Sequence, residues 1–147
     1  MARKIQTVTI TAEGRDKGKV FQITEMPASR AEMWALRALL AIGRSGVQLP
    51  DGIEKMGFAG IVSYGINLIT QLPYDEAEYL LGEMFTCVQI MPDPSRPQIL
   101  RGVQEDDIEE VATRITLRKE VFGLHSDFLK AVGKSTTAST SPIPPTA

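Results

Sequence analysis

Few residues of this chain could carry out acid–base or nucleophilic chemistry. His125 is the only histidine and Cys87 is the only cysteine. A general base needs a nucleophile and an orienting partner beside it, and a reactive thiolate needs a basic neighbour. Cys87 lies on a predicted apolar helix face and His125 lies in the predicted last helix, so we expect an inert, buried thiol and a partly buried or surface histidine. No catalytic residue is predicted, and the chain is expected not to be an enzyme.

Metal and phosphate sites are not predicted either. One His and one Cys cannot make the usual zinc ligand sets. The acids at 105–110 lack the alternating acids and central glycine of a calcium loop, and a helix N-terminus attracts such residues. Residues 14–19 (Gly-Arg-Asp-Lys-Gly-Lys) are one residue short of a phosphate loop and precede a predicted strand rather than a helix. We therefore expect no metal and no cofactor.

Composition narrows the class of protein further. A chain of 147 residues with 43% apolar and 23% charged residues is ordinary for one globular domain. The net charge of −2, with cations scattered among acids, argues against nucleic-acid binding. A single cysteine fits a reducing compartment, and residues 1–10 alternate polar and apolar side chains, unlike a signal peptide. These features predict a cytoplasmic protein.

One segment tests the prediction of solubility, because residues 56–74 carry no charge and approach the length of a membrane span. On a helix, polar side chains would share one face: Ser63, Asn67, Thr70 and Gln71. Apolar side chains would share the other: Phe58, Val62, Ile66 and Ile69. The segment therefore predicts an amphipathic helix that packs on a core, and no membrane association.

The order of the predicted elements is that of an α+β fold. Over 4–25, two runs of β-forming residues flank a polar turn with glycines, which predicts an N-terminal hairpin. Residues 28–132 then predict a mainly helical part of about four helices in the same domain. The segment 133–147 is rich in Ser, Thr and Pro and predicts a flexible tail.

The first predicted helix is the most apolar. Ser29 and Glu32 have the spacing of a capping box at its start, and Gly43 or Gly46 should end it. Residues 33–42 are apolar except for Arg37, which predicts a central, mostly buried helix with Trp34 in the core.

Two later helices are predicted on either side of a proline-rich loop at 91–97. One begins at Pro73, and its predicted inner stripe is Ala77, Leu80, Leu81, Met84 and Val88. The other spans about 105–129, and its predicted stripe is Ile108, Val111, Ala112, Ile115, Phe122 and Leu129.

Three blocks of sequence resemble the tail assembly chaperones of long-tailed bacteriophages. The first is Ile-Thr-Glu-Met-Pro-Ala at 23–28 with Trp-Ala-Leu-Arg-Ala at 34–38. The second is Leu-Leu-Gly-Glu-Met-Phe-Thr-Cys-Val-Gln-Ile at 80–90, and the third starts with Glu-Asp-Asp-Ile-Glu-Glu-Val-Ala-Thr-Arg at 105–114. Together they span roughly 4–128, and none is a catalytic signature.

The resemblance implies a protein that binds the helical tape measure protein in the host cytoplasm, keeps it soluble, helps to recruit tail tube subunits and is missing from the finished virion. In such proteins a frameshift near the end often makes a longer form that recruits the tube protein, and Gly133-Lys134 is a candidate position for it. Met84, Phe85 and Met91 are candidate partner-binding residues, because methionine suits adaptable surfaces, although each could equally be a core residue. The alternatives are a structural tail or head–tail connector component, whose hairpin would extend a neighbour's sheet, and a regulator of a host protein.

Overall fold

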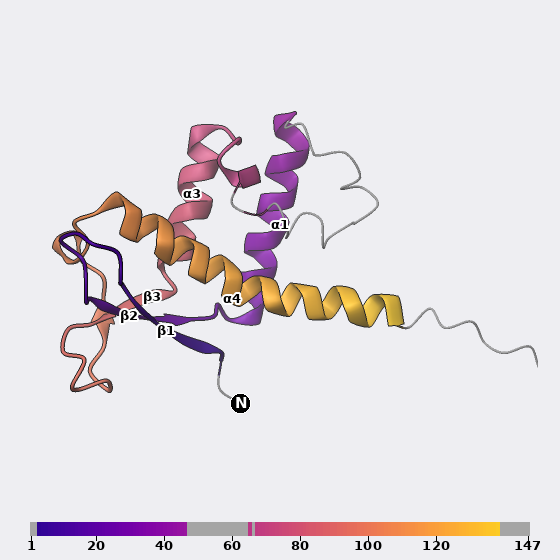
Figure 1. Cartoon of the computed structure of the whole chain (residues 1–147). Coiled ribbons are helices and arrows are strands. Elements are labelled where there is room, and N and C mark those ends of the chain that lie inside the picture. Colours follow the sequence, from indigo (N-terminus) through magenta and orange to yellow (C-terminus); the bar gives the residue numbers. More distant parts are fainter. Residues whose placement is uncertain (1–2, 47–64, 66, 139–147) are drawn as a thin grey trace, which may run out of the picture.

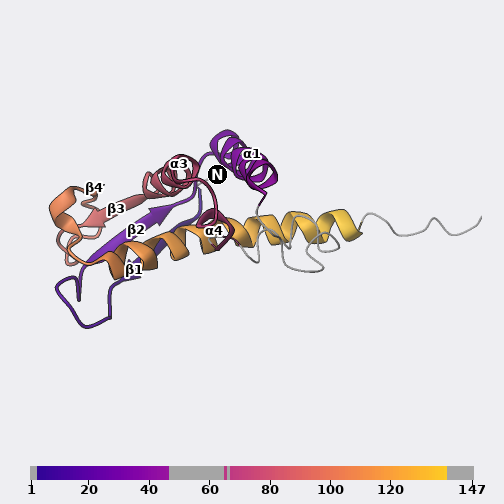
Figure 2. The same cartoon turned by 90° about the horizontal axis from the view of Figure 1, so that it is seen from above.

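The computed structural model describes residues 3–46, 65 and 67–138, with side chains as far as residue 125. Its centre is a four-stranded antiparallel sheet with the order β1-β2-β3-β4 (Figures 1 and 2; β4 is labelled in Figure 2). The strands are β1 (Ile5–Thr9), β2 (Val20–Thr24), β3 (Val88–Met91) and β4 (Arg101–Gly102). The first two form the predicted hairpin, with Val8 opposite Phe21.

The helices lie on one side of this sheet (Figures 1 and 2). They are α1 (Ala28–Ser45), α3 (Tyr74–Phe85) and α4 (Val111–Ala138), and a short 3-10 turn spans Glu105–Asp107. The predicted α+β fold, a hairpin followed by a mainly helical part, is confirmed.

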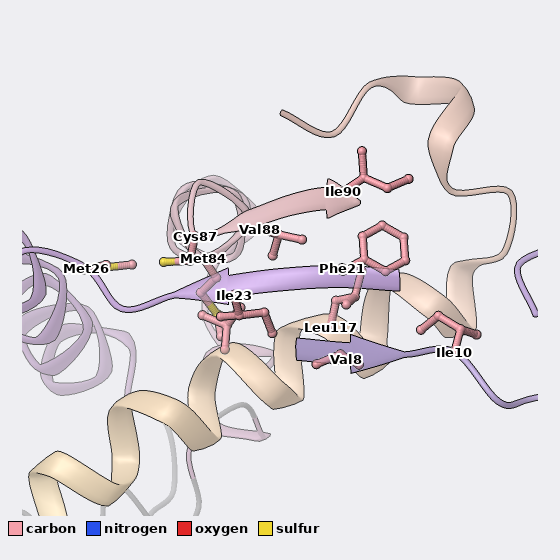
Figure 3. Packing of buried hydrophobic residues seen from close by; sticks show 11 residues of the cluster. Val8, Ile10, Phe21, Ile23, Met26, Met84, Cys87, Val88, Ile90 and Leu117 are labelled. Atoms are coloured by element: carbon pink, nitrogen blue, oxygen red, sulfur yellow. The ribbon is translucent and has the colours of Figure 1, made fainter. Parts of the chain in front are cut away.

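The main core lies between the sheet and the helices (Figure 3). Phe21 and Ile23 of β2 are completely buried, and neighbouring strands add apolar residues to the same face. Leu117 and Val121 of α4 cover this face together with Met84 of α3. In β1 the buried Val8 lies between Thr7 and Thr9, whose side chains are on the exposed side of the sheet, as strand periodicity requires.

The third strand was missed by the sequence analysis. The helix predicted from Pro73 ends at Phe85, so Val88 belongs to β3 rather than to the inner stripe of α3. In β3 Val88, Ile90 and Met91 are buried and Gln89 is half-buried, so the buried positions do not alternate over the whole strand. β3 pairs with β2, with Ile90 opposite Phe21, and this long-range pairing overrides the local helical pattern.

The start of α1 also differs from the prediction. Pro27 is the N-cap and no side chain caps the helix, so the capping box predicted from Ser29 and Glu32 is wrong. Proline presets the backbone at a helix start, and the helix can therefore begin two residues earlier than an N-cap at Ser29 would place it. Gly46 ends the helix in a left-handed conformation with φ of 69°, which confirms one of the two predicted stops.

The last helix is rotated relative to its predicted stripe. As far as residue 125, its buried positions are Thr113, Leu117 and Val121, spaced four apart, whereas Val111 and Ile115 are 73% and 46% exposed and Ala112 is exposed as well. The stripe prediction is therefore wrong for these three exposed residues, because more than one set of helical positions contains apolar side chains. The side chain of Leu129, also predicted in the stripe, lies outside the described ones. The helix begins at Val111 instead of 105, and three of the acids before it, Glu105, Asp106 and Asp107, form the 3-10 turn.

α4 continues to Ala138, past the position 133 where the flexible tail was predicted to begin. Ser and Thr are weak helix formers but not helix breakers, and the first proline after this point is Pro142. Residues 139–147 lie outside the described part of the chain.

The predicted amphipathic helix at 56–74 falls partly outside the described residues. In its described part Leu68, Ile69 and Leu72 are buried while Thr70 and Gln71 are exposed, which agrees with the predicted two faces there. Within the described residues, no helix combines the length and apolar character needed to cross a membrane.

Candidate partner-binding surface

The residues predicted to bind a partner lie mostly inside the protein. Met84 is 1% exposed and Met91 is 7% exposed, so a partner cannot contact either side chain in this conformation. Phe85 is half-buried, and the guanidinium groups of Arg114 and Arg118 cover its ring. A methionine pattern alone does not separate a binding surface from a core, and here the core contains these methionines.

The exposed apolar side chains gather instead on α1. The small residues Ala38 and Ala41 face inward with Ile42, and all three are buried. The larger Met33, Leu36 and Leu40 face outward and are 55%, 47% and 49% exposed. We call these three outward-facing residues the α1 ridge, and the prediction of a mostly buried α1 is wrong because of them.

The α1 ridge has the geometry of a helix-contacting stripe. Its members are spaced three and then four residues apart, which places them on one line along the helix, as in the seams of packed helices. Burying a leucine contributes about 1.5–3 kcal/mol to stability, so burial alone favours large apolar side chains on the inside of a helix. In α1 the large ones are on the outside and the small ones on the inside. The ridge therefore calls for an explanation other than the stability of the isolated chain.

α3 forms the second wall of a shallow groove beside the ridge. The indole N–H of Trp34 donates to the carbonyl oxygen of Leu80 at 3.0 Å, which joins the two helices. The groove has a volume of about 550 Å³, and Tyr79 of α3, 44% exposed, lines it opposite the ridge. Trp34 packs against the main core and against a second group of buried residues, which includes Ile42, Leu68 and Leu80, but its own side chain is only half-buried, so the prediction that it is buried is wrong.

The groove also has a definite pattern of charge. Arg37 pairs with Glu76 at 3.1 Å and lies over the Tyr79 ring at 3.6 Å, and the hydrogen bond to Glu76 raises the pKa of the guanidinium. Arg44 lines the groove near the end of α1, is exposed, and forms no ion pair with an acid of the described residues. One cation at the end of an apolar ridge favours a partner that presents a carboxylate there.

Cys87 is buried, and His125 is hydrogen-bonded to the backbone through both ring nitrogens. Burial raises the pKa of the Cys87 thiol, an effect larger than the opposing charge of Arg30, and this keeps the thiol protonated. The half-buried His125 has both ring nitrogens in use: Nε2 accepts the Met26 N–H at 2.9 Å, and Nδ1 lies 2.8 Å from the Val121 carbonyl oxygen. Since that carbonyl can only accept, Nδ1 carries the proton, and the ring fastens α4 to the segment before α1.

Asp16 is the most buried charged residue among the described side chains, and the sequence alone does not predict its role. It is 1% exposed, accepts the backbone N–H groups of Glu109 and Glu110, and pairs with Lys19 Nζ at 2.9 Å. Burial by itself would raise its pKa, but these hydrogen bonds outweigh that effect and hold the pKa well below its usual range. Asp16 joins the hairpin loop to the residues just before α4, and an aspartate in a glycine-flanked turn gives no local signal of such a partner.

Across the described parts of the chain, no three His, Cys, Asp or Glu side chains come together in a way that could hold a metal ion. Comparison with known proteins gives no match: no protein-family model, no curated protein and no solved structure is significantly similar to this chain.

Proposed function

We propose that this protein is a phage tail assembly chaperone that binds the tape measure protein in the host cytoplasm and keeps it soluble until the tail forms. The observation that carries the proposal is the α1 ridge, in which Met33, Leu36 and Leu40 are about half exposed. The collinear resemblance of the three sequence blocks supports the same role. We also propose that a frameshifted longer form recruits tail tube subunits. The chaperone would then be missing from the finished virion.

The physical case rests on the shape of the client. A tape measure protein is a long helix that exposes apolar stripes before the tail encloses it, and covering such stripes prevents aggregation. An amphipathic helix laid into a groove is a recurring mode of recognition, with anchors at spacings of three and four residues. The α1 ridge and Tyr79 supply the apolar wall for such a helix, and Arg44 would meet an acid at one end of it.

Co-expression tests the function directly. The tape measure protein of the same phage should be mostly insoluble when made alone and should become soluble, in a recoverable complex, when this protein is made with it. An unchanged soluble fraction together with no recovered complex would refute the proposal.

A second candidate function is a structural subunit of the tail or of the head–tail connector. The observation that favours it is the position of β1 at the edge of the sheet, where its outer side pairs with no strand of the described residues. Such an edge can accept a strand from a neighbouring subunit. Mass spectrometry of purified virions separates the two candidates, because a structural subunit would be present in stoichiometric amount and a chaperone would be missing.

A further inference from the structure

A second surface, on α4, contains two cations without acidic partners. Arg114 and Arg118 lie one helical turn apart and place their guanidinium carbons 4.1 Å and 5.0 Å from the centre of the Phe85 ring. Neither forms an ion pair with any acid of the described residues. By contrast, the structure pairs several other arginines with carboxylates: Arg15, Arg30, Arg37 and Arg101.

The surroundings of this pair disfavour two positive charges. Arg118 is half-buried, and its Nε is buried without a hydrogen-bond partner. Burial lowers the pKa of its guanidinium, and the charge of Arg114 lowers it further. A buried donor left without a partner is costly, and so are two like charges close together. An anion bound at the exposed parts of the two guanidinium groups would offset the repulsion between them.

The space beside Arg114 can admit a small anion. Phe85 and Arg114 line an open cavity of about 660 Å³ between α3, α4 and the end of β2, and Arg118, which contacts the same Phe85 ring, does not line it. Two acids also line it: Glu25, whose carboxylate accepts the Lys4 backbone N–H at 2.9 Å, and Glu105, which pairs with neither arginine. The Phe85 ring attracts both guanidinium groups by cation–π interaction, which restricts the positions that they adopt.

The apolar neighbours on α4 indicate where the anion comes from. Val111 lies one turn before Arg114, Ile115 lies one turn before Arg118, and both apolar side chains are exposed. A free phosphate ion gains nothing from exposed apolar groups, whereas a protein segment that carries an acid beside an apolar side chain would use both.

We propose that Arg114 and Arg118 bind a carboxylate presented by a protein partner, with Val111 and Ile115 contacting the apolar side chain next to it. This surface is separate from the α1 ridge, and the proposal depends on the chaperone function only for the identity of the partner. Guanidinium and carboxylate match in a planar, two-bond geometry, which favours a carboxylate at this site.

Nuclear magnetic resonance on the full chain tests the site without any client. The arginine Nε–H signals of the ¹⁵N-labelled protein would be followed during titration with sodium acetate, with sodium chloride at the same ionic strength as reference. Acetate should shift the Arg118 signal along a saturating curve with millimolar half-saturation, while Arg44 should respond as it does to chloride. Arg114→Gln should weaken the acetate response of Arg118 by about tenfold, the effect of one charge-assisted hydrogen bond.

Arg44→Gln is the matched control, since it removes another unpaired cation and should leave the Arg118 response unchanged. A linear acetate response in the wild-type protein, equal to that with chloride, would overturn the proposal even if a variant failed to fold. A titration with inorganic phosphate separates the two kinds of anion: saturation by phosphate but not by acetate would overturn the carboxylate assignment. None of these results depends on tape measure binding, so the chaperone proposal and this one can fail independently.

Discussion

Replacing Asp16 with alanine should destabilise the fold strongly, because its carboxylate joins segments that are far apart in sequence. The substitution would leave the N–H groups of Glu109 and Glu110 without their acceptor and would remove the ion pair with Lys19. Breaking a buried pair typically costs 3–5 kcal/mol, and we expect about 3 kcal/mol here. The lower end applies because Lys19 Nζ keeps its hydrogen bond to the Asp107 carbonyl oxygen.

The loss of stability in Asp16→Ala should become smaller as the pH falls. Burial raises the pKa of Asp16, but the hydrogen bonds from Lys19 and from the backbone outweigh it, so the pKa is depressed in the folded protein. A depressed carboxyl pKa stabilises the fold above the unfolded value of about 3.9, and the contribution is lost as the pH falls through the folded value. The difference between wild type and Asp16→Ala should therefore be constant at neutral pH and shrink below about pH 4.

Urea unfolding measures this difference, with the fluorescence of Trp34, the only tryptophan, as the signal. Asp93→Ala is the control, because Asp93 is also hydrogen-bonded, to Ser95, but is exposed, and its loss should cost no more than about 0.5 kcal/mol. Equal stability of wild type and Asp16→Ala at pH 7 would refute the reasoning. So would a difference that stays the same when the pH is lowered to about 3, where protonation should weaken the contribution.

Two further substitutions test the packing. Trp34→Phe removes the hydrogen bond to the Leu80 carbonyl oxygen and should cost about 1 kcal/mol in thermal unfolding; no change would mean that this link between α1 and α3 contributes nothing. Gly65→Ala would place a methyl group against the Phe122 ring at a backbone φ of 27°, and should destabilise the protein by about 2 kcal/mol. Adding Phe122→Leu should recover part of that loss, and no recovery would argue against the close approach of these two residues.

The sequence predicted the hairpin correctly because its signals are local. β-forming residues alternate on each side of a glycine-containing turn, and the strands that pair are neighbours in the chain. The strand at Val88–Met91 was not predictable in the same way, since no glycine or proline separates it from the apolar helix before it, and it is fixed by pairing with a distant strand. The local pattern of apolar residues contains no information about a strand partner that lies far away in the sequence.

The same limit explains the candidate site. In α1 every face carries apolar residues, so the pattern is that of a buried helix. Which face is buried depends on the helices that pack against it, and here Ala38 and Ala41 allow the close contact while Leu36 and Leu40 remain outside. The type of element could be predicted from the residues, but the orientation that exposes the ridge could not.

The measurement that tests the central claim most directly is the affinity of the tape measure protein for three versions of this chain. They are the wild type, the double variant Leu36→Glu with Leu40→Glu, and the control Ile99→Glu, which places one glutamate at a side chain of similar exposure outside α1. We expect the double variant to lose at least about a hundredfold in affinity, since two apolar contacts would be replaced by buried charges, while Ile99→Glu binds like the wild type. If the folded double variant binds the tape measure protein as tightly as the wild type, the α1 ridge is not the binding surface.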